Sequence, residues 1–226
     1  MDQSTKNMIY PLQVMAYKGY MNVLKTAAKI IPMPKPTLFT GSGSSLELCE
    51  AIAQMGSRKV LIVTDTVLLK LGILDSIQQT LTDNNVEFVI YDGVLPDPTY
   101  SQVESGLALY KSGDCDAILA VGGGSPIDAA KVIAARVNNH REIKKLTGLF
   151  KVWKSPAPLF VIPTTAGTGS EVTIAAVVSD PVTHKKTPLI DPKLVPMMAS
   201  LDASLMIGLP GPCHQRYWHG CINSCC

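Results

Sequence analysis

The sequence lacks the features that mark membrane, disordered or nucleic-acid-binding proteins. Charged residues make up 17% of its 226 residues, aromatic residues 6%, and the formal net charge is +2. No stretch approaches the roughly 18 consecutive apolar residues of a membrane span. An apolar share of 46% argues against disorder, and the balanced charge gives no reason to expect nucleic acid or lipid as a partner. We therefore expect a folded, cytoplasmic protein with one large core or two small ones.

Cysteine is scarce along most of the chain and crowded at its end. Only Cys49 and Cys115 precede residue 213, and a chain of this length needs no disulfides. The remaining cysteines lie near two histidines in the last residues: Cys213, Cys221, Cys225 and Cys226, beside His214 and His219. The spacing fits a structural zinc site poorly, because there is no Cys-x-x-Cys pair. A metal-binding tail stays open at this point.

Segments typical of strands and helices alternate after residue 35, following a helical extension expected over residues 1–33. We predict strands at residues 36–40, 60–64, 86–91, 115–121 and 159–162, with helices at 45–54, 75–84, 100–112 and 129–135. A β-hairpin is expected over 175–179 and 186–190. The alternation predicts the α/β class with a doubly wound parallel sheet. Ligands of such sheets bind at the carboxyl ends of the strands.

A glycine-rich turn joins the strand at 115–121 to the helix at 129–135. It reads Gly122, Gly123, Gly124, Ser125, Pro126, Ile127 and Asp128. We predict Ser125 as the N-cap, Pro126 as the first helical residue and Asp128 as part of a capping box. Glycines and an open helix start favour a dinucleotide pyrophosphate, whereas the alternative is an ordinary capped turn. The pattern is neither G-x-G-x-x-G nor a P-loop.

A second loop, residues 163–173, follows the strand at 159–162. Four threonines, one serine and two glycines in this loop offer hydroxyl groups and close backbone approach. The alternative is a solvated polar loop. Because this loop also follows a buried strand, we expect it to face the same crevice as the glycine-rich turn.

Residues 122–131 (GGGSPIDAAK) and 163–173 (PTTAGTGSEVT) resemble the two signature segments of the iron-containing (type III) alcohol dehydrogenases. Residues 61–65, 91–99 and 204–210 match as well, in family order. The resemblance implies a dinucleotide-binding domain followed by a helical metal-binding domain. The corresponding division is an extension at 1–35, a dinucleotide-binding domain at 36–202, and a remnant of the helical domain at 203–226, the rest of which we expect to be absent.

The resemblance also implies the cofactor site. Pyrophosphate would bind at Gly122, Gly123, Gly124 and Ser125, with Asp128 close by; Thr164, Thr165, Thr168 and Thr173 would line the nicotinamide and its ribose; Lys186 would contact a ribose; and Asp65 would bind the adenosine ribose hydroxyls. A carboxylate at Asp65 would repel a 2′-phosphate, which favours NAD over NADP. The alternative for Asp65 and Lys186 is a solvated charge.

The implied function is hydride transfer between a primary alcohol or aldehyde and NAD, with iron or zinc as the metal and a homo-oligomer, a dimer, as the assembly. A non-catalytic NAD-binding fragment or interaction module is the alternative of a different class. A relative of glycerol dehydrogenase or dehydroquinate synthase is a further alternative, but Ser125-Pro126 and the Thr-Thr-Ala-Gly-Thr stretch resemble the primary-alcohol branch.

The tail departs from the family. Members continue with Gly-Met-Asp-Ala-Leu-Thr-His-Ala, whose Asp and His bind the metal, whereas this chain ends in CHQRYWHGCINSCC. Codons shifted by one base permit the family segment without conflict and force its glycine at Trp218-His219. We therefore expect residues 211–226 to be out-of-frame translation and the truncated chain to be inactive without its metal ligands; His140 and His184 are expected to be solvated. The nucleotide sequence around codons 205–230 tests this expectation.

Overall fold

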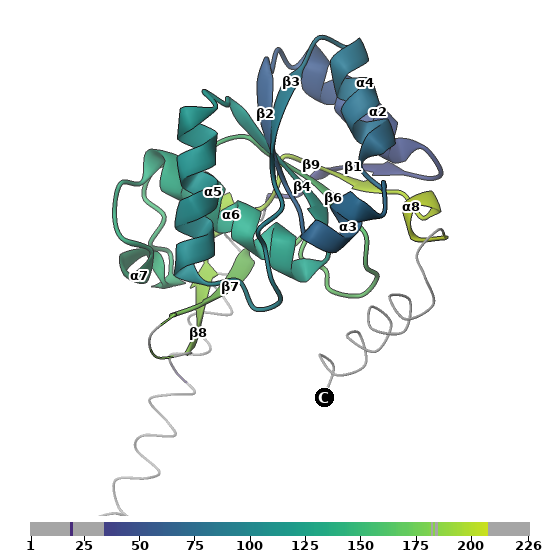
Figure 1. Ribbon diagram of the computed structural model, residues 1–226. Coiled ribbons are helices and arrows are strands. Elements are labelled where there is room, and N and C mark those ends of the chain that lie inside the picture. Colours follow the sequence, from purple (N-terminus) through teal and green to yellow (C-terminus); the bar gives the residue numbers. More distant parts are fainter. Residues whose placement is uncertain (1–18, 20–33, 182, 184, 208–226) are drawn as a thin grey trace, which may run out of the picture. The chain divides into compact units, whose positions relative to one another are not determined.

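The computed structural model describes residue 19 and residues 34–181, 183 and 185–207 (Figure 1). The chain divides into two compact units, Met1–Pro34 and Lys35–Cys226, and the strands and helices from Thr37 onward belong to the second. The helix expected over residues 1–33 and the tail at 211–226 lie outside the described residues, apart from residue 19. Among the described residues, no helix combines the length and apolar character that crossing a bilayer requires.

The centre of the fold is a six-stranded sheet in which every neighbouring pair is parallel. Its order is β1-β9-β6-β4-β2-β3. The strands are β1 (Thr37–Thr40), β2 (Lys59–Val63), β3 (Glu87–Tyr91), β4 (Ala117–Gly122), β6 (Leu159–Pro163) and β9 (Met198–Leu201). The predicted parallel α/β sheet is confirmed. β9 was not predicted; it separates β1 from β6.

Helices cover both faces of this sheet (Figure 1). One face carries α2 (Ser44–Gln54), α3 (Thr66–Lys70) and α4 (Asp75–Asp83); the other carries α5 (Tyr100–Ser112), α6 (Gly124–Asn138) and α7 (Ile143–Leu146). A 3₁₀ turn, η1 (Pro192–Leu194), precedes β9, and α8 (Ser204–Ile207) follows it. The doubly wound arrangement is thus confirmed.

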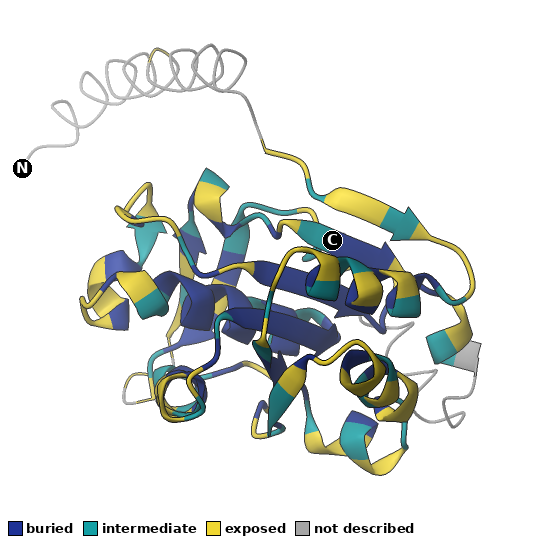
Figure 2. Cartoon of the chain, turned by 90° about the horizontal axis from the view of Figure 1, so that it is seen from above, coloured by how far each residue is buried: buried dark blue, intermediate teal, exposed yellow. Residues whose placement is uncertain are grey.

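The apolar run in β2 explains why both faces are covered. Leu61 and Val63 pack in the cluster under α5 and α6, whereas Val60 and Ile62 pack in the cluster under α2 and α4. Side chains alternate between the two faces of a strand, so a strand buried on both sides must be apolar at every position. Figure 2 shows the central strands as the buried layer between helices with exposed outer faces.

A smaller sheet in the order β5-β8-β7 accompanies the main one. It consists of β5 (Gly148–Leu149), β7 (Ala175–Ser179) and β8 (Lys186–Ile190). β7 and β8 pair in antiparallel register from Ala175 opposite Ile190 to Ser179 opposite Lys186. The predicted hairpin is therefore confirmed.

Candidate functional site

The carboxyl ends of β2, β4 and β6 lie side by side, with β4 in the middle. Thr64 follows β2, and Thr164 follows β6 and donates its backbone N–H to the Gly122 carbonyl at 3.0 Å. The side chains of Thr64, Thr164 and Thr165 are buried, and within the described residues their hydroxyl oxygens have no hydrogen-bond partner. An unpaired buried hydroxyl costs about 1–3 kcal/mol. Three of them at one sheet edge indicate a place for a polar ligand.

The glycine-rich turn lies between these threonines. Gly122 has φ +152°, and a Cβ there would lie 2.7 Å from Pro126 Cγ. The N-cap of α6 is Gly123, which makes no side-chain capping bond. The predicted capping by Ser125 and the capping box at Asp128 are therefore wrong: the helix begins at Gly124, so both residues already lie inside it. Within the described part of the chain no side chain caps the positive end of this helix, which suits an anion.

Two glycines of this turn, Gly122 and Gly124, are expected to differ in how much an alanine costs. Gly122→Ala is expected to lower the free energy of unfolding by about 2 kcal/mol, because of its backbone conformation and the clash with Pro126. Gly124→Ala meets ordinary contacts at 3.5 Å or more and lies in a helix, so its effect is expected to stay within about 0.5 kcal/mol. Urea denaturation followed by circular dichroism measures both. Equal effects would contradict this account.

The second loop touches the glycine-rich turn, as its position predicted. A Cβ at Gly124 would lie 3.5 Å from Ser170 Oγ and 3.6 Å from Thr168 Cγ2. Thr168 itself is exposed, whereas Thr164 and Thr165 are buried where the loop leaves β6. The loop therefore lies along the turn and presents polar side chains beside it.

Asp128 and Thr173 contact protein groups beside this edge. The Asp128 carboxylate accepts a hydrogen bond from the Val177 N–H of β7 at 3.0 Å. Burial raises the pKa of Asp128, and the Val177 N–H and the charge of Lys131 oppose this. Thr173 Oγ1 lies 3.1 Å from Nζ of Lys131, a buried lysine that the sequence reading did not single out. Both predicted site residues thus hold the chain segment around β7.

The two predicted charged residues also have partners. Asp65 Oδ1 caps α3 by accepting the N–H groups of Val67 and Leu68, each at 3.0 Å. Lys186 Nζ lies 2.6 Å from Asp97 Oδ1, and both side chains are more than half exposed. Asp65 therefore stands at the carboxyl end of β2, whereas Lys186 joins the hairpin to the loop after β3.

Neither a metal centre nor a reactive thiol appears in the described part of the chain. There, no three His, Cys, Asp or Glu side chains are grouped so as to hold a metal ion. His140 is exposed, as expected, and His184 lies outside the described residues. Burial raises the pKa of Cys49 to about 12 and that of Cys115 to about 11, which keeps both thiols protonated.

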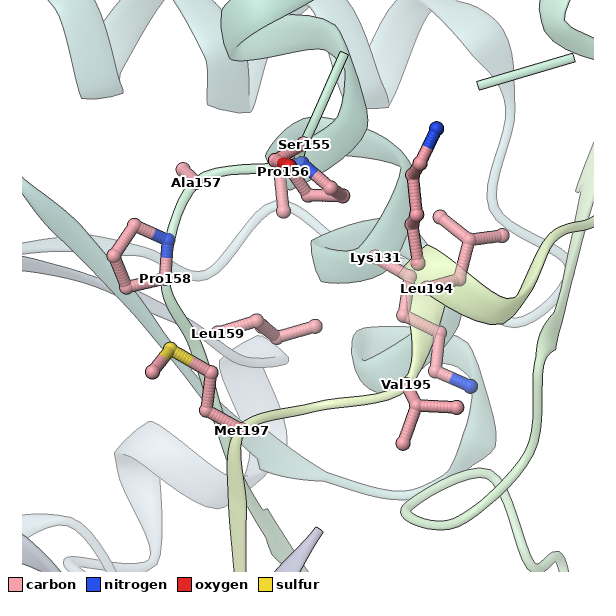
Figure 3. A pocket seen from close by; sticks show the side chains of 11 residues that line it. Lys131, Ser155, Pro156, Ala157, Pro158, Leu159, Leu194, Val195 and Met197 are labelled. Atoms are coloured by element: carbon pink, nitrogen blue, oxygen red, sulfur yellow. The ribbon is translucent and has the colours of Figure 1, made fainter. Parts of the chain in front are cut away.

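A cavity of about 270 Å³ lies at the other end of the strands, near the amino ends of β6 and β9 (Figure 3). Its walls come from α6, from residues 155–159 that lead into β6, and from residues 193–197 that lead into β9. Because it opens at the amino ends of these strands, it is separate from the threonines and glycines described above.

Comparison with known proteins identifies the family. A family model for iron-containing alcohol dehydrogenases matches residues 35–203. The chain belongs to the iron-containing alcohol dehydrogenase family. It is 36% identical to lactaldehyde reductase of Escherichia coli (strain K12) over 176 residues, 77% of this chain and 46% of that enzyme. It is also 36% identical to the NAD-dependent methanol dehydrogenase of Bacillus methanolicus over 175 residues, with the same coverage.

Solved structures of this family have the same fold. The alcohol dehydrogenase from Oenococcus oeni matches with a TM-score of 0.76 and 34% identity, covering 79% of this chain and 47% of that one. A 1,3-propanediol oxidoreductase matches with a TM-score of 0.75 and 32% identity, covering 80% and 48%. The chain spans about half the length of the curated relatives it matches. The resemblance drawn from the two loop motifs is confirmed.

Proposed function

We propose that this iron-containing alcohol dehydrogenase chain binds NAD at the carboxyl ends of β2, β4 and β6. The observation that carries the proposal is the group of unpaired buried hydroxyls of Thr64, Thr164 and Thr165 around the glycine-rich turn. A dinucleotide carries many hydroxyl and phosphate groups that can bond to them.

Each part of the site has a proposed role. The turn at Gly122, Gly123, Gly124 and Ser125 holds the pyrophosphate through backbone N–H groups and the open start of α6. Thr164, Thr165 and Thr168 face the nicotinamide half, Asp65 takes the adenosine ribose hydroxyls, and Lys186 approaches a ribose. Asp128 lies close to the pyrophosphate: its Oδ2 accepts the Val177 N–H, whereas its buried Oδ1 has no partner among the described residues. Thr173 lies on the ribose side, where Lys131 holds it. NAD, when bound, supplies the hydride acceptor or donor.

For the reaction, we propose oxidation of a small primary alcohol or reduction of its aldehyde, as the names of the related lactaldehyde reductase and methanol dehydrogenase suggest. The unpaired hydroxyls support a nucleotide at this site, whereas no three His, Cys, Asp or Glu side chains among the described residues are grouped so as to hold a metal ion. The division at residues 35 and 202, the out-of-frame tail, the inactivity of the chain and a homodimeric assembly stay predictions. Zinc in place of iron, and NADP in place of NAD, have no support.

Removing the buried hydroxyls tests the proposal. Thr164→Val and Thr165→Val are expected to lower the affinity for NADH roughly fivefold each, while leaving the stability of the free protein equal or higher, because an unpaired buried hydroxyl is lost. Titration of NADH fluorescence gives the affinity, and thermal unfolding gives the stability. Thr82→Val, on the exposed side of α4, is the matched control and should change neither. Unchanged NADH affinity in both site variants would refute the assignment.

A further inference from the structure

Lys131 of α6 is a fully buried lysine with 0% exposure. Its Nζ donates to the Thr173 carbonyl at 2.7 Å, the Ala175 carbonyl at 2.9 Å and Thr173 Oγ1 at 3.1 Å. An ammonium group has three N–H donors, so these bonds use all of them. All three acceptors lie where the second loop, residues 163–173, runs into β7.

This is a costly way to fill a core position. Burial lowers the pKa of Lys131 to about 8, although the charges of Asp128 and Glu171 oppose the shift. No carboxylate lies within ion-pair distance of its Nζ in the described part of the chain. A methionine would fill similar space without burying a cation. The lysine adds a geometric constraint that methionine cannot supply: its three N–H groups hold the carbonyl groups of Thr173 and Ala175 and the Thr173 hydroxyl around one nitrogen atom.

That point is connected to the nucleotide site through one helix. α6 begins with the glycine-rich turn, and its Asp128 holds the Val177 N–H of β7. Lys131, one turn further along, holds Thr173 and Ala175. The end of the loop is thus anchored to α6. The middle of the loop contacts the start of the same helix, since Thr168 and Ser170 lie against Gly124. The start of the loop is held by the bond from Thr164 N–H to the Gly122 carbonyl.

We propose that Lys131 is a positioning residue of the nucleotide site: it anchors the end of the 163–173 loop to α6 and so holds the loop's hydroxyl groups against the glycine-rich turn. It does not touch the nucleotide. This rests on the proposed function, because the bound molecule is taken to be NAD. The anchoring itself concerns only the protein.

The test compares Lys131→Met with Arg136→Met on the same helix in the 226-residue chain. Arg136 pairs with Glu104 of α5, away from the loop, at 2.9 Å. Lys131→Met is expected to weaken NADH binding about tenfold, the equivalent of one hydrogen bond to a charged group. Amide hydrogen exchange should become faster in residues 163–173 while the strands of the main sheet stay protected. Arg136→Met should lower stability without changing either readout.

A milder pair of variants covers the case in which Lys131→Met does not fold. Thr173→Val removes one of the three acceptors, and Thr173→Ser keeps it. NADH affinity and loop protection should fall in the valine variant and be restored in the serine variant. Equal behaviour of these two variants would overturn the proposal. So would faster exchange spread evenly over the sheet in Lys131→Met, since that indicates a general packing role. If the unaltered chain binds no NADH, the proposed function fails, whereas the exchange pattern still decides whether Lys131 anchors the loop.

Discussion

Replacement of Asp202 by alanine is expected to lower the free energy of unfolding by about 3 kcal/mol, because it leaves the two buried donors of Ser45 without an acceptor and removes the bonds to the half-buried Gly43 and the exposed Ser204. Asp202 follows β9 and is 2% exposed. Its Oδ2 accepts from Gly43 N–H, Ser45 N–H and Ser45 Oγ, and its Oδ1 accepts from Ser204 N–H and Ser204 Oγ. One carboxylate thus joins the end of β9 to the start of α2 and to α8.

The dependence on pH follows from the same contacts. Burial alone would raise the pKa of Asp202, but the hydrogen bonds from Ser204 and Ser45 outweigh it and hold the pKa below its usual value. A carboxyl whose pKa is lower in the folded than in the unfolded state contributes stability above the unfolded pKa, about 4. This contribution is lost as the pH falls through the folded pKa. The stability difference between Asp202→Ala and the unaltered chain should therefore shrink in acid.

Urea denaturation at pH 7 and at pH 3 measures both effects. Asp83→Ala is the control, because among the described residues the Asp83 carboxylate accepts only an exposed bond from Gln79. Its effect on the free energy of unfolding is expected to stay within about 0.5 kcal/mol. A loss at Asp202 no larger than at Asp83, or one that grows in acid, would show that the carboxylate does not hold these elements together.

The strands of the main sheet differ in how far the sequence alone could predict them. The runs at β2, β4 and β6 were predicted because a strand covered on both faces must be apolar throughout, and this is visible locally. β9 was missed because it is short and contains Ser200. Ser200 is buried, and its hydroxyl is paired with the hydroxyl of Ser44, 156 residues earlier in the chain. No local pattern predicts such a partner.

The same limit applies to the site. The sequence predicted that the glycine-rich turn and the 163–173 loop lie together at the carboxyl ends of the strands, because each follows a buried strand. Within the glycine-rich turn, Ser125-Pro126 has the sequence of a cap and first helical residue, yet Gly123 takes the cap because its extended backbone allows the helix to begin at once. Lys131 in the run AAKVIAA looks like a solvated helix residue, since its acceptors lie 42 and 44 residues further along. Thr64 could have been found as a hydroxyl directly after an apolar strand.

Asp65→Ser is expected to shift the preference between NADP and NAD toward NADP by about 10-fold to 100-fold. In the proposed site the Asp65 carboxylate faces the adenosine ribose, where it would repel a 2′-phosphate. Asp65 also caps α3 by accepting the N–H groups of Val67 and Leu68. Serine removes the charge but can still cap the helix, so the variant separates the effect of the charge from that of the cap. Serine is a comparably good N-cap, so stability should change by less than about 0.5 kcal/mol.

Titrations with NADH and NADPH, each on the unaltered chain and on Asp65→Ser, give the ratio of affinities. Asp75→Ser is the control, since Asp75 lies in the first turn of α4 rather than at the end of a strand. If Asp65→Ser leaves the ratio unchanged and only lowers the melting temperature, the carboxylate is a helix cap and nothing more. If the ratio of NADPH to NADH affinity shifts at constant stability, the Asp65 side chain both caps α3 and selects the cofactor. A residue at the carboxyl end of a parallel strand can do both, because it starts the next helix and also lies beside the ligand crevice.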